Sequence, residues 1–127
     1  MRNKESEIIF QRSRDLCLRV LRMAGHIRES FVSDFILEQL IRASAYIGIY
    51  YKASCNAVTP IEAAEKLNLA RETAINILFW LELIEGCEMV KADRLVGLKQ
   101  ETEALFEIFS DGLKTSKTGT RRKSMNS

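Results

Sequence analysis

Side chains that could carry out catalysis are scarce in this chain. His26 is the only histidine among 127 residues, which excludes a histidine-based triad and a metal site built from several histidines. The three cysteines, Cys17, Cys55 and Cys87, include no C-x-x-C pair, so the sequence supports neither a disulfide framework nor a zinc site. No glycine-rich phosphate loop is present. We therefore expect no enzymatic activity, no catalytic residue, no metal and no cofactor.

Basic side chains are the better candidates for function. Three arginines of the first helical segment fall within about 80° of one another on a helix that turns about 100° per residue. From residue 114 onward the chain has five basic residues and no acidic one. We expect these side chains to contact the phosphates of RNA or DNA, although the three arginines could instead only keep an exposed helix face soluble. The predicted nucleic-acid-binding residues are Arg12, Arg19, Arg22, Lys114, Lys117, Arg121, Arg122 and Lys123.

The charge of the chain is unevenly distributed. Its formal net charge is +2, and removing the five basic residues of the C-terminal segment leaves −3 for residues 1–113. Within that body, residues 57–113 carry eleven acidic and five basic side chains. An acidic body disfavours nucleic-acid contact over most of the surface. A purely structural, self-assembling protein without a nucleic-acid partner is therefore an alternative.

The elements that position these residues are predicted to be helices. Apolar residues recur at helical spacing over four segments, at about 5–27, 33–53, 59–86 and 92–113. Thr59-Pro60-Ile61-Glu62 has the form of a capping box with proline at the first helical position. Short connections favour an antiparallel up-down-up-down four-helix bundle. We expect an all-α domain over residues 1–115 and a disordered basic tail over residues 116–127.

The second and third segments carry more apolar side chain than one bundle core can bury. The second is apolar nearly all round, and the third has a second apolar set beside its main stripe. Such a patch is a liability when exposed, so we expect a homo-oligomer, with a monomer of unusually apolar surface as the alternative. The predicted interface residues are Tyr46, Ile49, Tyr50, Ile75, Phe79, Trp80 and Leu83.

The sequence predicts a cytoplasmic protein. No apolar stretch reaches the roughly eighteen uninterrupted residues that a membrane span needs. The charged N-terminus is followed by no signal-peptide core. We therefore expect no membrane partner.

Two stretches carry a family resemblance. Gln39-Leu-Ile-Arg-Ala-Ser-Ala-Tyr-Ile-Gly48 is similar to a Q-L-x-R-[AS]-x-x-S-I-G motif, and Phe79-Trp80-Leu81-Glu82-Leu83 is similar to a [YF]-W-L-x-L motif. The segment from Ile108 to Lys117 resembles a closing helix that runs into a basic tail. From about Phe10 to Lys117 the chain thus resembles the bacterial four-helix bundle proteins of the ribosomal-RNA intervening-sequence type.

This resemblance implies an antiparallel four-helix bundle that assembles as a homopentamer and is not an enzyme. The related accessory variability proteins of diversity-generating retroelements bind a reverse transcriptase and nucleic acid, so the resemblance suggests partners of these two kinds. Three positions depart from the family pattern. Tyr50 stands where the family usually has asparagine, and Thr73 and Asn76 stand where it often has acidic residues. An aromatic ring at position 50 favours packing over polar chemistry.

A second resemblance is to the helix-turn-helix of catabolite-activator-type transcriptional regulators. In residues 59–82, Ala64 would be the small packing residue and Asn68 the turn. The base-reading side chains would be Arg71, Glu72 and Asn76. Two observations disfavour this alternative: the apolar stripe stays in register straight through Asn68, and residues 57–91 carry six acidic and three basic groups. A helix that is continuous through Asn68 would exclude it.

Overall fold

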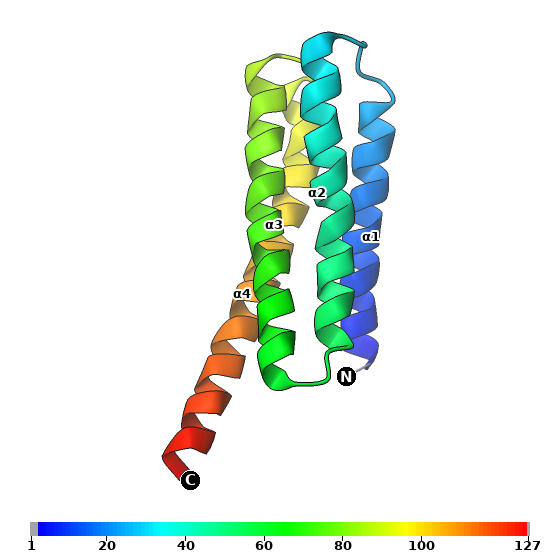
Figure 1. The fold of residues 1–127 in the computed structure, drawn as a ribbon. Helices are drawn as coiled ribbons and strands as arrows, with labels where there is room; N and C mark the ends of the chain where they lie inside the picture. Colours follow the sequence, from blue (N-terminus) through cyan, green and yellow to red (C-terminus); the bar gives the residue numbers. More distant parts are fainter. Residues whose placement is uncertain (1–2, 127) are drawn as a thin grey trace.

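The chain forms four helices joined by short connections. A computed structural model describes residues 3–126, with the side chains of residues 3–115. The helices are α1 (Lys4–Ala24), α2 (Phe31–Cys55), α3 (Pro60–Gly86) and α4 (Ala92–Asn126). Consecutive helices run antiparallel (Figure 1), and residues 3–126 contain no strand. The predicted all-α, up-down-up-down bundle is confirmed.

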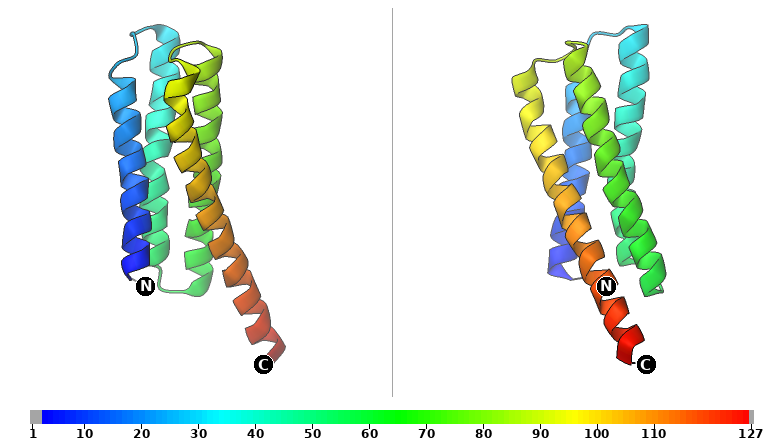
Figure 2. Two further views of the ribbon diagram at one scale, coloured as in Figure 1. Left: turned by 180° about the vertical axis from the view of Figure 1, so that it is seen from behind. Right: turned by 90° about the vertical axis from the view of Figure 1, so that its left-hand side faces the viewer.

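The four helices are arranged as a ring in which each helix packs on its neighbours in sequence. Contact is most extensive between α2 and α3, then between α3 and α4, and then between α1 and α2. The ring is closed by the contact of α1 with α4, which is the least extensive of the four. Figure 2 shows why: the second half of α4 diverges from α1 toward its C-terminal end.

The core lies along the bundle axis and is supplied by one stripe from each helix. The stripe of α3 is buried from Ala70 to Ile84, and its members recur every three or four residues. Two buried hydroxyls, those of Ser13 and Thr102, donate to the carbonyls of Ile9 at 3.0 Å and Leu98 at 2.7 Å. Residues with no exposed surface include Leu16, Val20, Leu40, Ile47, Ala70, Ala74, Ile77, Leu81, Leu95, Leu105 and Phe109.

The start of α3 follows the predicted capping pattern only in part. The Thr59 hydroxyl accepts the backbone N–H of Glu62 at 3.1 Å, and Pro60 occupies the first turn. The Glu62 carboxylate accepts from the backbone N–H of Val58 at 3.4 Å. A capping box would direct it to the N–H of Thr59 instead. The cap of α3 is therefore a threonine cap with a carboxylate that reaches one residue further back.

The helix-turn-helix alternative is excluded by the continuity of α3. The helix runs from Pro60 to Gly86 without interruption, and Asn68 lies in its third turn rather than between two helices. The Asn68 amide donates to the carboxylate of Glu72 at 3.2 Å, a contact of one helical turn. No change of chain direction is present at which a separate recognition helix could begin.

The C-terminal end of the described backbone is helical, and α4 continues to Asn126. The disordered basic tail over residues 116–127 stays a prediction. This segment contains no proline and several lysines and arginines, which tolerate a helix well. Figure 1 shows that this part of α4 extends past the ends of the other helices. The side chains of Lys117, Arg121, Arg122 and Lys123 lie outside the described residues.

Candidate functional site

The predicted interface residues lie together on the outer surface of α2 and α3, which we call the α2–α3 face. Tyr46, Ile49, Ile75 and Phe79 are each between 43% and 54% exposed, a large fraction for apolar side chains on regular helices. The rest of the predicted set, Tyr50, Trp80 and Leu83, is half-buried and packs against the core. The structure therefore places all seven residues on the outer surfaces of α2 and α3, and Tyr46, Tyr50 and Trp80 line one hollow there.

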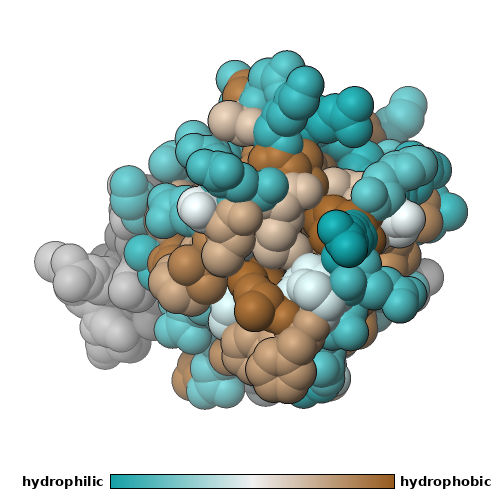
Figure 3. Space-filling view, turned by 90° about the horizontal axis from the view of Figure 1, so that it is seen from above, coloured by the Kyte–Doolittle hydropathy of each residue, from teal (hydrophilic) through white to brown (hydrophobic). Residues whose placement is uncertain are grey.

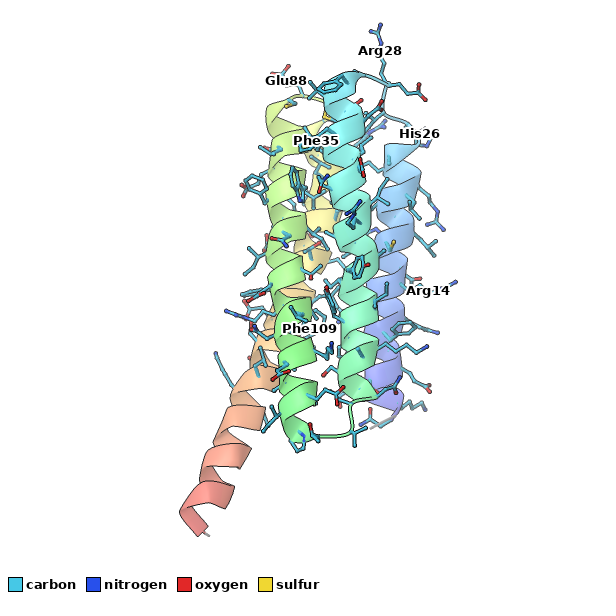
Figure 4. The ribbon with its side chains drawn as sticks, viewed as in Figure 1. Arg14, His26, Arg28, Phe35, Glu88 and Phe109 are labelled. Atoms are coloured by element: carbon cyan, nitrogen blue, oxygen red, sulfur yellow. The ribbon has the colours of Figure 1, made fainter. Side chains whose placement is uncertain are left out.

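Two aromatic clusters divide this face. Near one end, the rings of Phe35 and Trp80 meet edge to face at 6.0 Å, and Phe79 meets Trp80 at 5.1 Å. Figure 4 shows Phe35 between α2 and α3. Further along, Tyr46 and Tyr50 lie 5.4 Å apart. These distances are those of favourable aromatic pairs, so contacts within one copy already position these rings.

Sequence reasoning missed two aromatic residues of this region. Phe35 is 54% exposed and Phe31 is 90% exposed, at the end of the bundle that carries the α1–α2 connection. Figure 3 views that end and shows apolar residues at the surface within a hydrophilic rim. The signal was present in the spacing, because Phe31, Phe35, Tyr46 and Ile49 fall on one side of a helix at 100° per residue.

A hollow of about 370 Å³ lies between the two aromatic clusters. Its floor and walls combine the amides of Gln39 and Asn76, the guanidinium of Arg42, and the rings of Tyr46, Tyr50 and Trp80. The Arg42 guanidinium also donates to Glu38 at 3.2 Å, and both side chains of that pair are almost two-thirds exposed. Such an exposed pair holds its members weakly.

The three predicted arginines of α1 have different surroundings. Arg12 donates to Glu101 of α4 through two hydrogen bonds, from Nε at 3.0 Å and from Nη2 at 2.7 Å. These bonds and the charge of Glu101 raise the pKa of Arg12 against its partial desolvation. Arg19 is exposed and its guanidinium lies over Gly97 of α4, while Arg22 is exposed near the end of α1.

Arg12 is therefore held in a contact between helices, and Arg19 and Arg22 are the predicted α1 cations that stay open to solvent. Arg14, which the prediction omitted, also points away from the bundle (Figure 4), with Asp15 beside it at 3.7 Å. On α4, Lys114 is exposed. The basic surface that the described side chains present thus follows the outer side of α1.

His26 and Tyr51 are two titratable side chains in contrasting surroundings. His26 is exposed at the end of α1, and no group of three or more His, Cys, Asp and Glu residues could hold a metal ion among the described residues. Tyr51 is buried, stacks on Phe109 at 5.5 Å, and has its pKa raised by burial and by a hydrogen bond with Cys55. Among the same residues, no helix is both long and apolar enough to cross a membrane.

Comparison with known proteins identifies the fold. No protein-family model matches the chain, and no match is found among curated proteins. A solved structure of similar shape is a protein of unknown function from the S23 ribosomal protein family of Bacteroides thetaiotaomicron. It superimposes with a TM-score of 0.76 over 86% of this chain and 97% of that chain, at 17% sequence identity. A likeness at this identity establishes the shared fold and leaves function to be argued from the surfaces.

Proposed function

We propose that this chain is a non-enzymatic adaptor that assembles with copies of itself and contacts nucleic acid. In this proposal the α2–α3 face joins the copies, and the basic side of α1 and the C-terminal part of α4 bind RNA, DNA or an enzyme that acts on them. The observation that carries the proposal is the exposure of Tyr46, Ile49, Ile75 and Phe79 on one face of the bundle. We place the protein in the cytoplasm.

The exposed apolar residues of the α2–α3 face support self-association. Contiguous apolar surface of this kind marks interaction sites in soluble proteins, and aromatic residues are enriched at such sites. The core of the bundle is already complete without these side chains, since Ile47, Ala74 and Ile77 fill it from the same two helices. The exposed residues therefore lie outside the core that holds the fold together.

The family resemblance adds two finer proposals. The S23-type fold of the neighbouring structure agrees with an assignment to the intervening-sequence type of four-helix bundle, for which a homopentamer is the expected assembly. A reverse transcriptase is the protein partner that the related retroelement accessory proteins suggest. An assembly would also repeat Arg19 and Arg22 in every copy, which raises the avidity for a polyanion without any new contact.

Two measurements test the proposal. Light scattering at micromolar concentration should give the mass of an assembly. A clean monomer would contradict the proposed self-association. Filter binding to RNA and DNA over a salt series should show affinity that falls steeply with salt. Affinity that is unchanged after deleting residues 114–127 and replacing Arg19 and Arg22 would remove the second half.

The acidic body favours a second candidate, a purely structural self-assembling protein. Residues 57–113 carry six more acidic than basic side chains. If this candidate is right, light scattering will still show an assembly, but no salt-sensitive retention of RNA or DNA will accompany it.

A further inference from the structure

The hollow on the α2–α3 face is lined by one cation, Arg42, and by no anion. The Arg42 guanidinium and the Trp80 indole can only donate, and no carboxylate lines the hollow. The Gln39 and Asn76 amides can both donate and accept, and the Thr73 hydroxyl already donates to the carbonyl of Leu69 at 2.7 Å. Arg42 is the one charged side chain of this lining, so an acceptor with a negative charge complements it. Arg42 and Trp80 also come from the two separate motifs of the sequence, which the fold brings to one place.

The α3 side of the same face has carboxylates at each end of its apolar pair. Ile75 and Phe79 are about half exposed, and Glu72 and Glu82 precede and follow them at helical spacing. A second copy that covers Ile75 and Phe79 would lie next to these two carboxylates. A carboxylate that loses water without gaining a partner opposes association, so each needs a donor in the interface.

Of the two carboxylates, Glu82 is the one that needs a donor from outside its own copy. Glu72 already accepts from the Asn68 amide at 3.2 Å. Glu82 is exposed, and among the described residues it has neither a hydrogen bond nor an ion pair. Arg42 is its natural complement, because the contact of Arg42 with Glu38 is solvent-exposed and weak.

We propose that the hollow between α2 and α3 receives the Glu82 carboxylate of a second copy, with Arg42 as its charged donor, and that this contact sets the register in which copies associate. The inference rests on the proposed self-association through the α2–α3 face. A phosphate of nucleic acid has the same acceptor chemistry. A bound phosphate would leave the aromatic clusters on both sides of the hollow exposed to water. A helix of a second copy would cover these clusters and fill the hollow at the same time.

The test compares the dissociation constants of the assembly by sedimentation equilibrium. Arg42→Gln and Glu82→Gln should each weaken association about tenfold or more, because each leaves one covered charge without its partner. Arg42→Glu should abolish association, and Arg42→Glu combined with Glu82→Arg should restore it at least in part. Circular dichroism should show that all the variants keep the helical content of the parent chain.

Matched controls separate this contact from other effects. Glu38→Gln removes only the partner of Arg42 within its own copy, and Arg28→Gln and Glu29→Gln change exposed charges in the α1–α2 connection, so all three should associate as the parent does. Normal association of both Arg42→Gln and Glu82→Gln would overturn the inference and leave self-association standing. Loss of RNA retention by Arg42→Gln without loss of association would overturn it in favour of a phosphate. A parent chain that is a monomer would overturn the proposed function itself.

Discussion

Arg12 of α1 and Glu101 of α4 are joined by two parallel hydrogen bonds, Nε to Oε2 at 3.0 Å and Nη2 to Oε1 at 2.7 Å. The side chain of Glu101 is 22% exposed and that of Arg12 is 38% exposed. This two-bonded geometry is stronger than a single contact between charges, and it lies across the least extensive helix contact of the bundle. An arginine that sequence reasoning assigned to nucleic acid is thus engaged in closing the fold.

Replacing Arg12 should therefore lower stability. We expect Arg12→Gln to reduce the free energy of unfolding by about 1–2 kcal/mol, because the mostly buried Glu101 carboxylate loses both donors. Urea unfolding followed by circular dichroism measures the change. Arg14→Gln is the control, since its contact with Asp15 is long and exposed, and it should change stability by less than about 0.5 kcal/mol. Equal effects of the two substitutions would contradict this role of Arg12.

Removing an exposed ring of the α2–α3 face should weaken assembly and leave the fold intact. Phe79 is 52% exposed, so Phe79→Ser should shift the assembly toward monomers at micromolar concentration while the helical content stays constant. Light scattering measures the shift. Val96→Ser removes an apolar side chain of similar exposure, 48%, from α4, outside this face. If the Val96 variant dissociates as readily as the Phe79 variant, copies do not meet through α2 and α3.

The exposed arginines of α1 should determine part of the salt dependence of RNA binding. Each phosphate contact contributes about 0.7 to the slope of log K against log salt for a single strand and about 0.9 for a duplex. Replacing both Arg19 and Arg22 with Gln should thus reduce the slope by about 1.4 to 1.8 for each bound copy. Arg12→Gln should leave the slope unchanged, because its guanidinium is already bound to Glu101. If the slope falls as much in the Arg12 variant as in the Arg19 and Arg22 variant, Arg12 also contacts phosphate.

Tyr51 should destabilise the fold at alkaline pH. Its pKa in the folded protein is raised above the ordinary value of 10.0 by burial and by the hydrogen bond with Cys55. The unfolded chain ionises this tyrosine first, so the stabilising effect is complete below about pH 10 and is lost as the pH rises toward the folded pKa. Tyr51→Phe should consequently lose less stability than the parent chain between about pH 9 and pH 11.

A glycine of α4 should be replaceable with a gain in stability. A Cβ built on Gly97 would lie 2.7 Å from Nη2 of Arg19, which is the far end of a flexible side chain and can move. We expect Gly97→Ala to raise the free energy of unfolding by about 0.5–1 kcal/mol through helix propensity. In Gly112→Ala the new Cβ would meet the Leu67 side chain at 2.9 Å inside the α3–α4 contact, so that variant should gain less or lose stability. Thermal unfolding of both variants decides between these outcomes.

Helix positions and the core could be predicted from the sequence because both depend on local spacing. The buried residues of α3 recur at a regular spacing, and the cap at Thr59 involves residues that are close together in the chain. The pairing of Arg12 with Glu101 could not be predicted, since the two residues are 89 positions apart and meet only through the rotation of α1 against α4.

The seam between α1 and α4 also bears on the order in which the bundle forms. The extensive α2–α3 and α3–α4 contacts join helices that follow one another in the chain, so little loop entropy opposes them and they can nucleate folding. The α1–α4 seam joins the two ends of the sequence and gains the least contact, which makes it the last part to close during synthesis and the first to open in native-state fluctuations. In hydrogen exchange, the amides of α1 should therefore be the least protected of the four helices within the bundle. Arg19 and Arg22 then lie on α1, the helix that separates from the bundle first.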